Sequence, residues 1–164
     1  MVEIRTASSE DAVGINEIGN YYIDKTVANF KTERLSIKER ENWMGTFSNS
    51  GRYRLAVATD EKVILGYACS SIYYDRSAYQ TSVTTSIYLQ AAACAKGLGT
   101  QLYSYLFELL AGEDIKRAYA GITLPNEASQ RFHAKFGFKE VGIFTQAGRK
   151  YGKYWDVLWM EKPM

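Results

Sequence analysis

The chain has little proline, few cysteines and a single histidine. Of its 164 residues only Pro125 and Pro163 are proline, so no proline-rich linker divides the sequence. Its two cysteines, Cys69 and Cys94, lie far apart and form no CxxC pair. This usage favours reduced thiols and a cytoplasmic location over a disulfide-stabilised secreted fold. One histidine without a cysteine cluster argues against a zinc site, so we expect no metal.

The sequence also lacks the features of membrane proteins and nucleic-acid-binding proteins. No apolar stretch approaches the length needed to cross a bilayer, and residues 1–5 lack the basic and apolar regions of a signal peptide. The net charge is only +2, whereas nucleic-acid-binding proteins concentrate basic residues in a patch. We therefore expect neither a membrane nor a nucleic acid as partner.

What is present is the composition of a globular protein. Hydrophobic residues make up 46% of the chain and charged residues 23%, both ordinary values for such proteins. The length predicts a single domain, residues 1–164, with a sizeable hydrophobic core. Thirteen tyrosines supply apolar rings with polar tips, and we expect many of them to line a cleft or an interface.

Hydrophobic periodicity and turn residues predict a mixed α/β fold. Ser36 and Glu39 have the spacing of a capping box, and the helix that begins near Leu98 is expected to stop at Gly112, a residue suited to a left-handed C-cap. The predicted order is β-α-α-β-β-β-α-β-α-β-β, a central sheet covered by helices. Strands are expected at 2–6, 53–59, 63–74, 81–90, 117–123, 139–144 and 153–160, and further helices at 10–22, 36–47 and 127–136.

A strand, a glycine-containing loop and a helix follow one another in the middle of the chain, over residues 86–110. The loop and helix start read Cys94, Ala95, Lys96, Gly97, Leu98, Gly99 and Thr100. Free amides at a helix N-terminus favour a phosphate group, and glycine lets the backbone approach it closely. A Walker loop and a dinucleotide fingerprint both require residues that are absent here. A plain tight turn remains the alternative.

A second segment combines a helix cap with the single histidine. Asn126 is suited to cap the helix that follows, and Ser129 and His133 lie four residues apart, so they share one helix face. Taken alone, a cap and a structural histidine explain both features.

Together the two segments resemble the GNAT superfamily of N-acetyltransferases, whose central sheet is mixed and mostly antiparallel. In that family the pyrophosphate of acetyl-CoA rests on the loop before the third helix. Its pantetheine arm lies beside the preceding strand, and an asparagine at the start of the next helix bonds that arm. The resemblance thus implies the following acetyl-CoA-binding residues: Ile87, Tyr88, Leu89, Cys94, Ala95, Lys96, Gly97, Leu98, Gly99, Thr100, Asn126 and Ser129.

Most of the chain is similar to one branch of this superfamily, the phosphinothricin (methionine sulfoximine) acetyltransferases. The similarity implies a small amino-acid-like amine as acceptor and a homodimer, in which exposed Trp155 and Trp159 could contribute to the interface. The motifs that carry it are Asn20-Tyr21-Tyr22, Ala28-Asn29-Phe30 with Thr32-Glu33, Tyr74-Asp75-Arg76-Ser77-Ala78-Tyr79, Val141-Gly142, Gly148-Arg149-Lys150 and Tyr154-Trp155-Asp156-Val157.

Two positions depart from the pattern of this branch. Cys94 stands where the acetyl-CoA loop normally opens with arginine or glutamine, so a charged contact to the cofactor is missing. Thr84 stands where the branch usually carries a glutamate in the preceding strand. Threonine cannot act as the base that deprotonates the amine, although it could hold a relaying water. Glu33 is the nearest carboxylate by family context and is a weaker candidate for that role.

The remaining roles follow from the resemblance. Backbone amides of residues 87–89 would polarise the thioester carbonyl, and His133 would lie near the CoA sulfur and protonate the leaving thiolate. Arg76 could pair with the acceptor carboxylate, and Phe30 and Tyr79 could wall the acceptor pocket. Transfer is expected to be direct, without a covalent enzyme intermediate.

Two alternatives remain open at this point. The same cofactor could serve another acceptor, such as an ordinary amino acid, a polyamine or a protein N-terminus. Because Cys94 and Thr84 replace residues typical of the branch, the chain could also bind acyl-CoA without turnover.

Overall fold

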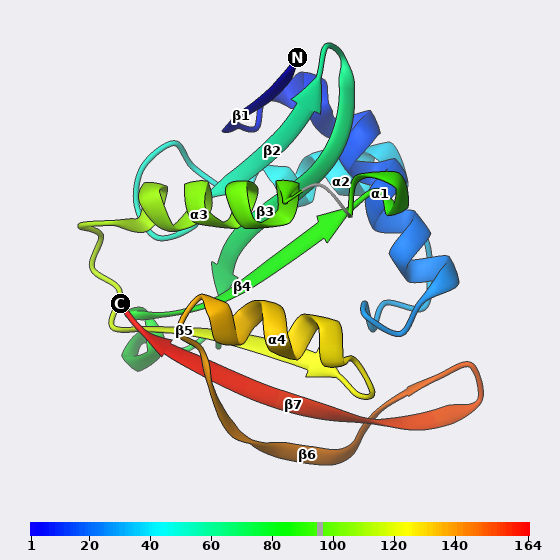
Figure 1. The fold of residues 1–164 in the computed structure, drawn as a ribbon, viewed down its shortest axis with the longest axis vertical. Helices are drawn as coiled ribbons and strands as arrows, with labels where there is room; N and C mark the ends of the chain where they lie inside the picture. The colour runs from blue at the N-terminus through cyan, green and yellow to red at the C-terminus, as the bar shows by residue number, and fades with distance from the viewer. Residues whose placement is uncertain (95–96) are drawn as a thin grey trace.

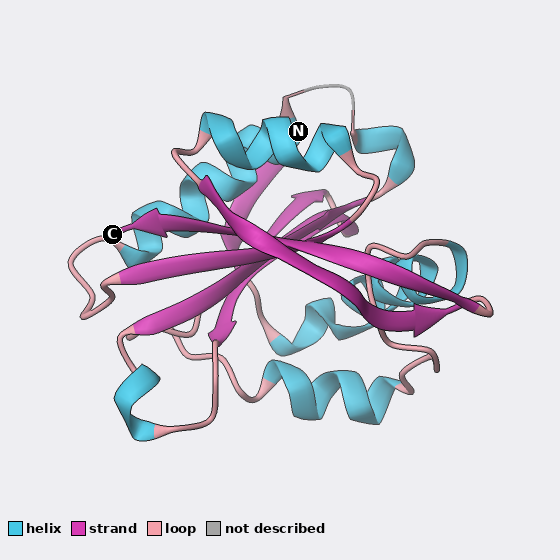
Figure 2. Cartoon of the chain, turned by 90° about the horizontal axis from the view of Figure 1, so that it is seen from below, coloured by secondary structure: helices cyan, strands magenta, loops and turns pink. Residues whose placement is uncertain are grey.

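A computed structural model describes residues 1–94 and 97–164 (Figure 1). In these residues seven strands form one sheet in the order β1-β2-β3-β4-β5-β7-β6. Helices cover both faces of the sheet (Figure 2). The strands are β1 (Val2–Thr6), β2 (Leu55–Asp60), β3 (Val63–Ile72), β4 (Ser82–Leu89), β5 (Arg117–Thr123), β6 (Lys139–Lys150) and β7 (Lys153–Pro163), and the α-helices are α1 (Ala12–Lys25), α2 (Ile37–Met44), α3 (Leu98–Leu110) and α4 (Glu127–Lys135).

The strand pairing confirms the predicted fold class. Neighbouring strands run antiparallel except β4 and β5, which pair in parallel. A parallel pair needs a crossover connection, and α3 supplies it. The order of helices and strands is the one that periodicity predicted.

Several predicted boundaries were wrong. The first helix begins at Ala12 after a 3₁₀ turn over Ser9–Asp11, and it continues to Lys25 instead of ending at Tyr22. Helix α3 ends at Leu110; Ala111 is extended, and Gly112 (φ +82°) lies one residue beyond the cap.

Strand β6 continues to Lys150 although its second half lacks the alternation that marks a strand, because β7 pairs with it there. The hairpin is irregular between Phe144 and Gly148, where the register shifts. An edge strand of this kind gains its order from its partner, which local sequence does not reveal.

Side-chain caps mark the start of α2 and of the 3₁₀ turn that precedes α1. Ser36 accepts a bond from the Glu39 amide at 3.2 Å, and the Glu39 carboxylate accepts one from the Ser36 amide at 2.8 Å, which confirms the predicted capping box. A second capping box joins Ser8 and Asp11 ahead of α1.

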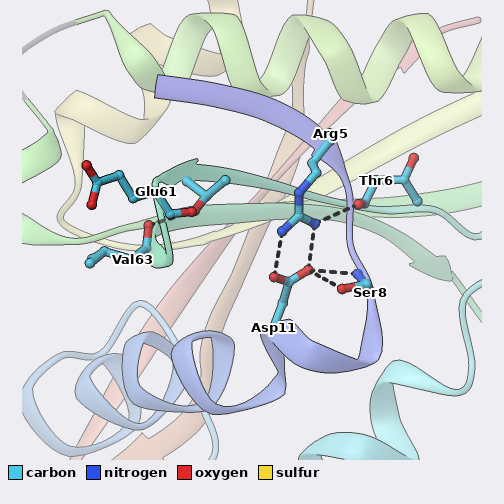
Figure 3. Close-up of polar contacts among 7 residues, drawn as sticks. Arg5, Thr6, Ser8, Asp11, Glu61 and Val63 are labelled. Carbon is cyan, nitrogen blue, oxygen red and sulfur yellow. Dashed lines mark hydrogen bonds and ion pairs between the residues drawn. The ribbon is translucent and has the colours of Figure 1, made fainter. Parts of the chain in front are cut away.

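Asp11 also ties the start of α1 to strand β1. Arg5 donates two bonds of 2.8 Å to its carboxylate, and the Ser8 amide donates a third at 2.7 Å (Figure 3). Burial alone would raise the pKa of Asp11, but the bonds from Arg5 and Ser8 outweigh it and lower that pKa. The carboxylate is therefore held ionised at the junction of strand and helix.

The sheet separates two hydrophobic cores. On one face, Leu102, Tyr103 and Leu106 of α3 are fully buried against small residues of β2 and β3, among them Ala56 and Ala68. On the other face, a second core forms under α1 and α2. Its members are Ile15, Ile18, Leu55, Val57, Ile64, Tyr67 and Cys69. Small side chains under α3 let the helix approach the sheet closely, which fixes the position of its N-terminus.

Replacing Leu102 by alanine should test this packing. Because Leu102 is 0% exposed, Leu102→Ala is expected to lower the free energy of unfolding by about 2–5 kcal/mol. The matched control is Gln101→Ala on the exposed side of the same helix, which should change it by less than about 0.5 kcal/mol. Urea unfolding of both variants checks the prediction, and equal losses would contradict it.

Candidate functional site

The central strands β4 and β5 separate about halfway along their length. They pair in parallel from Ser82 to Thr84 on β4 and from Arg117 to Tyr119 on β5, and the pairing ends there. Figure 1 shows the two strands running apart towards their C-terminal ends. The opening between them is a cavity of about 280 Å³.

The cavity has walls from both faces of the sheet. Tyr22 and Ala28 come from the side of α1, whereas Gly99 of α3 and the first turns of α4 come from the other side. The complete lining is Tyr22, Ala28, Thr85, Ser86, Ile87, Tyr88, Leu89, Cys94, Gly99, Ala120, Gly121, Ile122, Thr123, Asn126, Ala128, Ser129, Phe132 and His133.

Backbone groups of β4 face this opening. The Thr81 carbonyl accepts a bond from the Lys116 amide on the β5 side, at 2.7 Å, and the Gln90 amide donates to Leu65 on the β3 side, at 2.8 Å. Since backbone groups alternate between the two edges of a strand, the odd-numbered residues Ile87 and Leu89 direct theirs into the opening. A main-chain edge that has lost its neighbouring strand can pair with an extended, amide-bearing ligand.

The N-terminus of α3 adds a second group of free donors. Gly97 caps the helix in the left-handed conformation (φ +71°), which favours glycine. The first amides of a helix have no intrahelical partner, so those of Leu98, Gly99 and Thr100 are available to an anion. A Cβ on Gly99 would come within 3.1 Å of Leu89; glycine therefore keeps the space between α3 and β4 open.

Helix α4 brings three predicted residues together. Asn126 caps the helix by accepting from the Ser129 amide at 3.1 Å, as predicted. His133 Nδ1 lies 2.8 Å from the Ser129 carbonyl oxygen and 3.3 Å from its hydroxyl oxygen. All three residues line the cavity.

The surroundings of His133 determine which ring nitrogen carries the proton and how readily the ring gains a second one. A carbonyl oxygen only accepts, so we assign the proton to Nδ1, which leaves the lone pair of the neutral ring on Nε2. The ring is 6% exposed and packs edge-on against Tyr103 and Phe138, with centroids 5.6 and 5.3 Å away. Burial lowers the pKa of His133 from its usual 6.5, although the bond to Ser129 opposes this shift. At neutral pH His133 is therefore a proton acceptor in an apolar pocket.

The two other predicted catalytic residues lie outside the cavity lining. The Thr84 hydroxyl oxygen lies 3.5 and 3.3 Å from the main-chain carbonyl oxygens of Ser71 and Ile72, and its single proton can go to either. Glu33 is exposed on the segment between α1 and α2. No carboxylate occurs among the cavity-lining residues in the described part of the chain.

Among the described residues of the predicted cofactor loop, only some line the cavity. Cys94 is exposed and lines the cavity, whereas the Leu98 side chain belongs to the core and Thr100 is exposed. Ala95 and Lys96, also predicted to bind the cofactor, lie outside the described residues.

The three predicted acceptor residues do not form one group: Arg76 and Tyr79 lie together, whereas Phe30 lies elsewhere. Phe30 packs against Gly148 of β6, where a Cβ would overlap its ring. Arg76 stacks 5.6 Å over the Tyr74 ring, and Tyr79 lies against the same ring at 5.6 Å. Arg76 and Tyr79 precede β4, at the opposite end of that strand from Leu89. Within one chain they therefore lie away from the cavity.

Tyr22 lies in one of the motifs that resemble the branch, but the sequence assigned it no role in the site. Its hydroxyl donates to the Leu89 carbonyl at 2.8 Å, which occupies one of the β4 acceptors that faces the opening. No local signal shows that this end of α1 meets the end of β4.

Two classes of site find no support in the described ranges. No group of three or more histidine, cysteine, aspartate or glutamate side chains there is placed to hold a metal ion. Each helix of these ranges is also too short or too polar to span a bilayer.

Comparison with known proteins gives a consistent match over nearly the whole chain. A family model described as an acetyltransferase (GNAT) domain matches residues 4–159. The chain is 47% identical to a phosphinothricin N-acetyltransferase from Streptomyces coelicolor, over 99% of this chain and 96% of that protein. It is 30% identical to an L-methionine sulfoximine/L-methionine sulfone acetyltransferase from Pseudomonas aeruginosa, over 96% and 92%.

Solved structures agree with this match. A phosphinothricin acetyltransferase from Sinorhizobium meliloti, determined in complex with acetyl-CoA, superposes with a TM-score of 0.91 at 30% identity. The superposition covers 99% of this chain and 88% of that one.

The environment of His133 predicts how stability depends on pH. Because the pKa of His133 is lower in the folded state, its imidazole is mostly neutral in both the folded and the unfolded chain well above pH 6.5. As the pH falls below that value, the unfolded chain binds a proton first, so the free energy of unfolding decreases. Since the chain has one histidine, a single imidazole resonance should titrate below 6.5 by NMR. His133→Asn should remove this part of the pH dependence; an ordinary pKa in the folded protein would contradict the assignment.

Proposed function

The chain belongs to the GNAT family of acetyltransferases and is an acetyl-CoA-dependent N-acetyltransferase; from this premise we propose its acceptor and the residues that act. The proposed acceptor is the amino group of a small amino-acid-like molecule of the phosphinothricin, methionine sulfoximine or methionine sulfone type. The observation that carries the proposal is 47% identity to a phosphinothricin N-acetyltransferase over nearly the full length of both proteins. We further propose that residues 1–164 act as a single domain.

The opening between β4 and β5 suits an extended thioester cofactor. The free edge of Ile87 and Leu89 is suited to the amide groups of a pantetheine arm, and the amides at the start of α3 to its pyrophosphate. Asn126 uses its side-chain oxygen to cap α4, so its amide nitrogen is the group offered to the arm. Ser129 has a hydroxyl at the same wall of the cavity. Each of these contacts uses main-chain or neutral groups, which explains how Cys94 can replace a charged residue.

We propose that His133 moves the proton. When bound, acetyl-CoA supplies the acetyl thioester that the acceptor amine attacks directly. As the amine nitrogen bonds to the carbonyl carbon it becomes acidic, and Nε2 of neutral His133 can take its proton. The resulting imidazolium can return that proton to the leaving thiolate, the role that the family resemblance implies. A positioned acid–base group of this kind is typically worth about 10²–10⁴-fold in rate.

Main-chain donors complete the proposed chemistry. The Leu89 carbonyl is taken by Tyr22, so the strand end is held while the amide donors of Ile87 and Leu89 remain for the thioester carbonyl oxygen. The Tyr88 amide faces β3 by the same alternation and is not among them. Preorganised donors stabilise the negative charge that develops on that oxygen. Thr84 and Glu33 are assigned no proton transfer, since neither lines the cavity.

We also propose a cytoplasmic homodimer without a nucleic-acid or membrane partner. Exposed apolar side chains of the edge strand β6 support it, namely Val141, Ile143 and Phe144. Trp155 and Trp159, predicted to be exposed, are half-buried within their own chain. If Arg76 and Tyr79 contact an acceptor, their distance along β4 from the cavity requires that this be the acceptor of a second copy.

The acceptor panel is the first test. Release of free CoA from acetyl-CoA should be strong with phosphinothricin, methionine sulfoximine and methionine sulfone, and weak with ordinary amino acids and polyamines. Turnover confined to polyamines or peptides would replace the proposed acceptor. Acetyl-CoA binding without release on any amine would mean a non-catalytic binder.

Substitution of His133 tests its role in proton transfer. His133→Ala should lower kcat by about 10²-fold or more, while the Kd for acetyl-CoA changes little because the cofactor contacts are main-chain groups and Asn126. Calorimetry and steady-state kinetics on the same preparation measure both quantities. Unchanged kcat would remove His133 from the mechanism.

A further inference from the structure

Lys150, the last residue of β6, is a buried cation. It is 4% exposed, and in the described residues no carboxylate oxygen lies within ion-pair distance of its ammonium group. Its Nζ instead donates to the main-chain carbonyls of Thr26 and Asn29, both at 2.7 Å. Burial lowers the pKa of Lys150, so the buried charge carries a cost that these two bonds offset.

Other residues of the β6–β7 hairpin contact the same part of the chain, the end of α1 and the segment that follows it. The Tyr151 hydroxyl donates to the Asp24 carbonyl at 2.7 Å. Phe30 lies so close to Gly148 that a Cβ there would overlap the ring. The turn between β6 and β7 thus holds the segment 26–30, which follows α1, at both of its ends.

Segment 26–30 forms a wall of the cavity. Ala28 lines the cavity together with Tyr22, and the Asn29 side chain reaches the Tyr88 hydroxyl of β4 at 3.5 Å. This wall lies on the α1 side of the sheet, whereas Gly99, Asn126 and Ser129, the groups suited to the cofactor, lie on the opposite side. The segment belongs to no helix or strand, so its position depends on the groups that hold it.

We propose that Lys150 is a positioning residue for acceptor binding: it fixes the segment 26–30 as the wall against which the amine is placed. The inference rests on the proposed function, because it assigns this wall to the acceptor of that reaction. An ammonium group suits the task because it offers several donors at one point and can therefore hold two carbonyls three residues apart. An apolar side chain of similar length, such as methionine, would leave both carbonyls without this donor.

The kinetic test compares two lysines of one turn. Lys150→Met should lower kcat/KM for the acceptor by about tenfold to a hundredfold, since small displacements of positioning groups cost this much, and the KM for acetyl-CoA should stay nearly constant. Lys153→Met is the matched control, because Lys153 is exposed and pairs with Lys150 across the turn. Equal effects of the two variants, or a loss shared with acetyl-CoA, would overturn the proposal.

Hydrogen exchange gives a readout that needs no activity. Amides of residues 24–31 should exchange faster in Lys150→Met than in wild type or Lys153→Met, with the rest of the sheet unchanged. If Lys150 instead contacted the acceptor directly, activity would fall while exchange stayed at the wild-type rate, and the positioning role would be wrong. If the wild-type protein acetylated none of the amines, the proposed acceptors would be refuted. The exchange result would still decide whether Lys150 holds the segment.

A milder variant guards against global unfolding. Tyr151→Phe removes one bond to the end of α1 and leaves Lys150 in place; it should raise exchange of the same amides and the acceptor KM, by less than Lys150→Met does. Tyr154→Phe, an exposed tyrosine on the same hairpin, is its control. Equal exchange rates and equal acceptor KM in the two tyrosine variants would contradict the proposal that the hairpin holds the segment 26–30.

Discussion

The parting of β4 and β5 beyond the Thr84–Tyr119 pair is the constraint on which the rest of the structure depends. Parallel strands that stay paired satisfy each other's backbone groups, and no ligand could then enter the sheet. Here the pairing stops, and the odd-numbered residues of β4 face an opening. The polar edge that results is stable only if water, a side chain or a ligand satisfies it. Tyr22 satisfies one carbonyl, and the rest of the edge is available for binding.

Helices on the two faces of the sheet make this opening asymmetric. On one face, small residues of β2 and β3 bring α3 close enough that its free amides and Gly99 lie at the opening, and α4 adds Asn126, Ser129 and His133. On the other face, α1 and the segment that follows it form the wall with Tyr22 and Ala28. The first face offers donors suited to a phosphate-bearing cofactor, whereas the second is held by Lys150 and Tyr151 of a distant hairpin. A cofactor and an acceptor can thus approach the same point from different sides.

Local sequence signals predicted much of the fold and the local structure around α4. The Ser36–Glu39 cap, the strand at 117–123, the Asn126 cap and the shared helix face of Ser129 and His133 depend on neighbours in sequence, and they appear as predicted. The acceptor side of the site could not be predicted from such local signals. Tyr22 reaches Leu89 across 67 positions and Lys150 reaches Thr26 across 124, and no periodicity encodes such pairs. The length of β6 was missed for the same reason, since β7 orders it.

The sequence by itself determined the order of helices and strands, including the strand and the helix that flank the predicted anion-binding loop, and the family to which the chain belongs. These follow from hydrophobic periodicity, glycine and capping residues, and motifs in a fixed order. Only the tertiary structure decided where the strands part, that His133 is buried with its proton on Nδ1, that Arg76 and Tyr79 lie at the far end of β4, and that Lys150 holds the opposite wall. Each of these depends on burial and on contacts between distant segments, which arise only when the sheet and its two helical layers pack together.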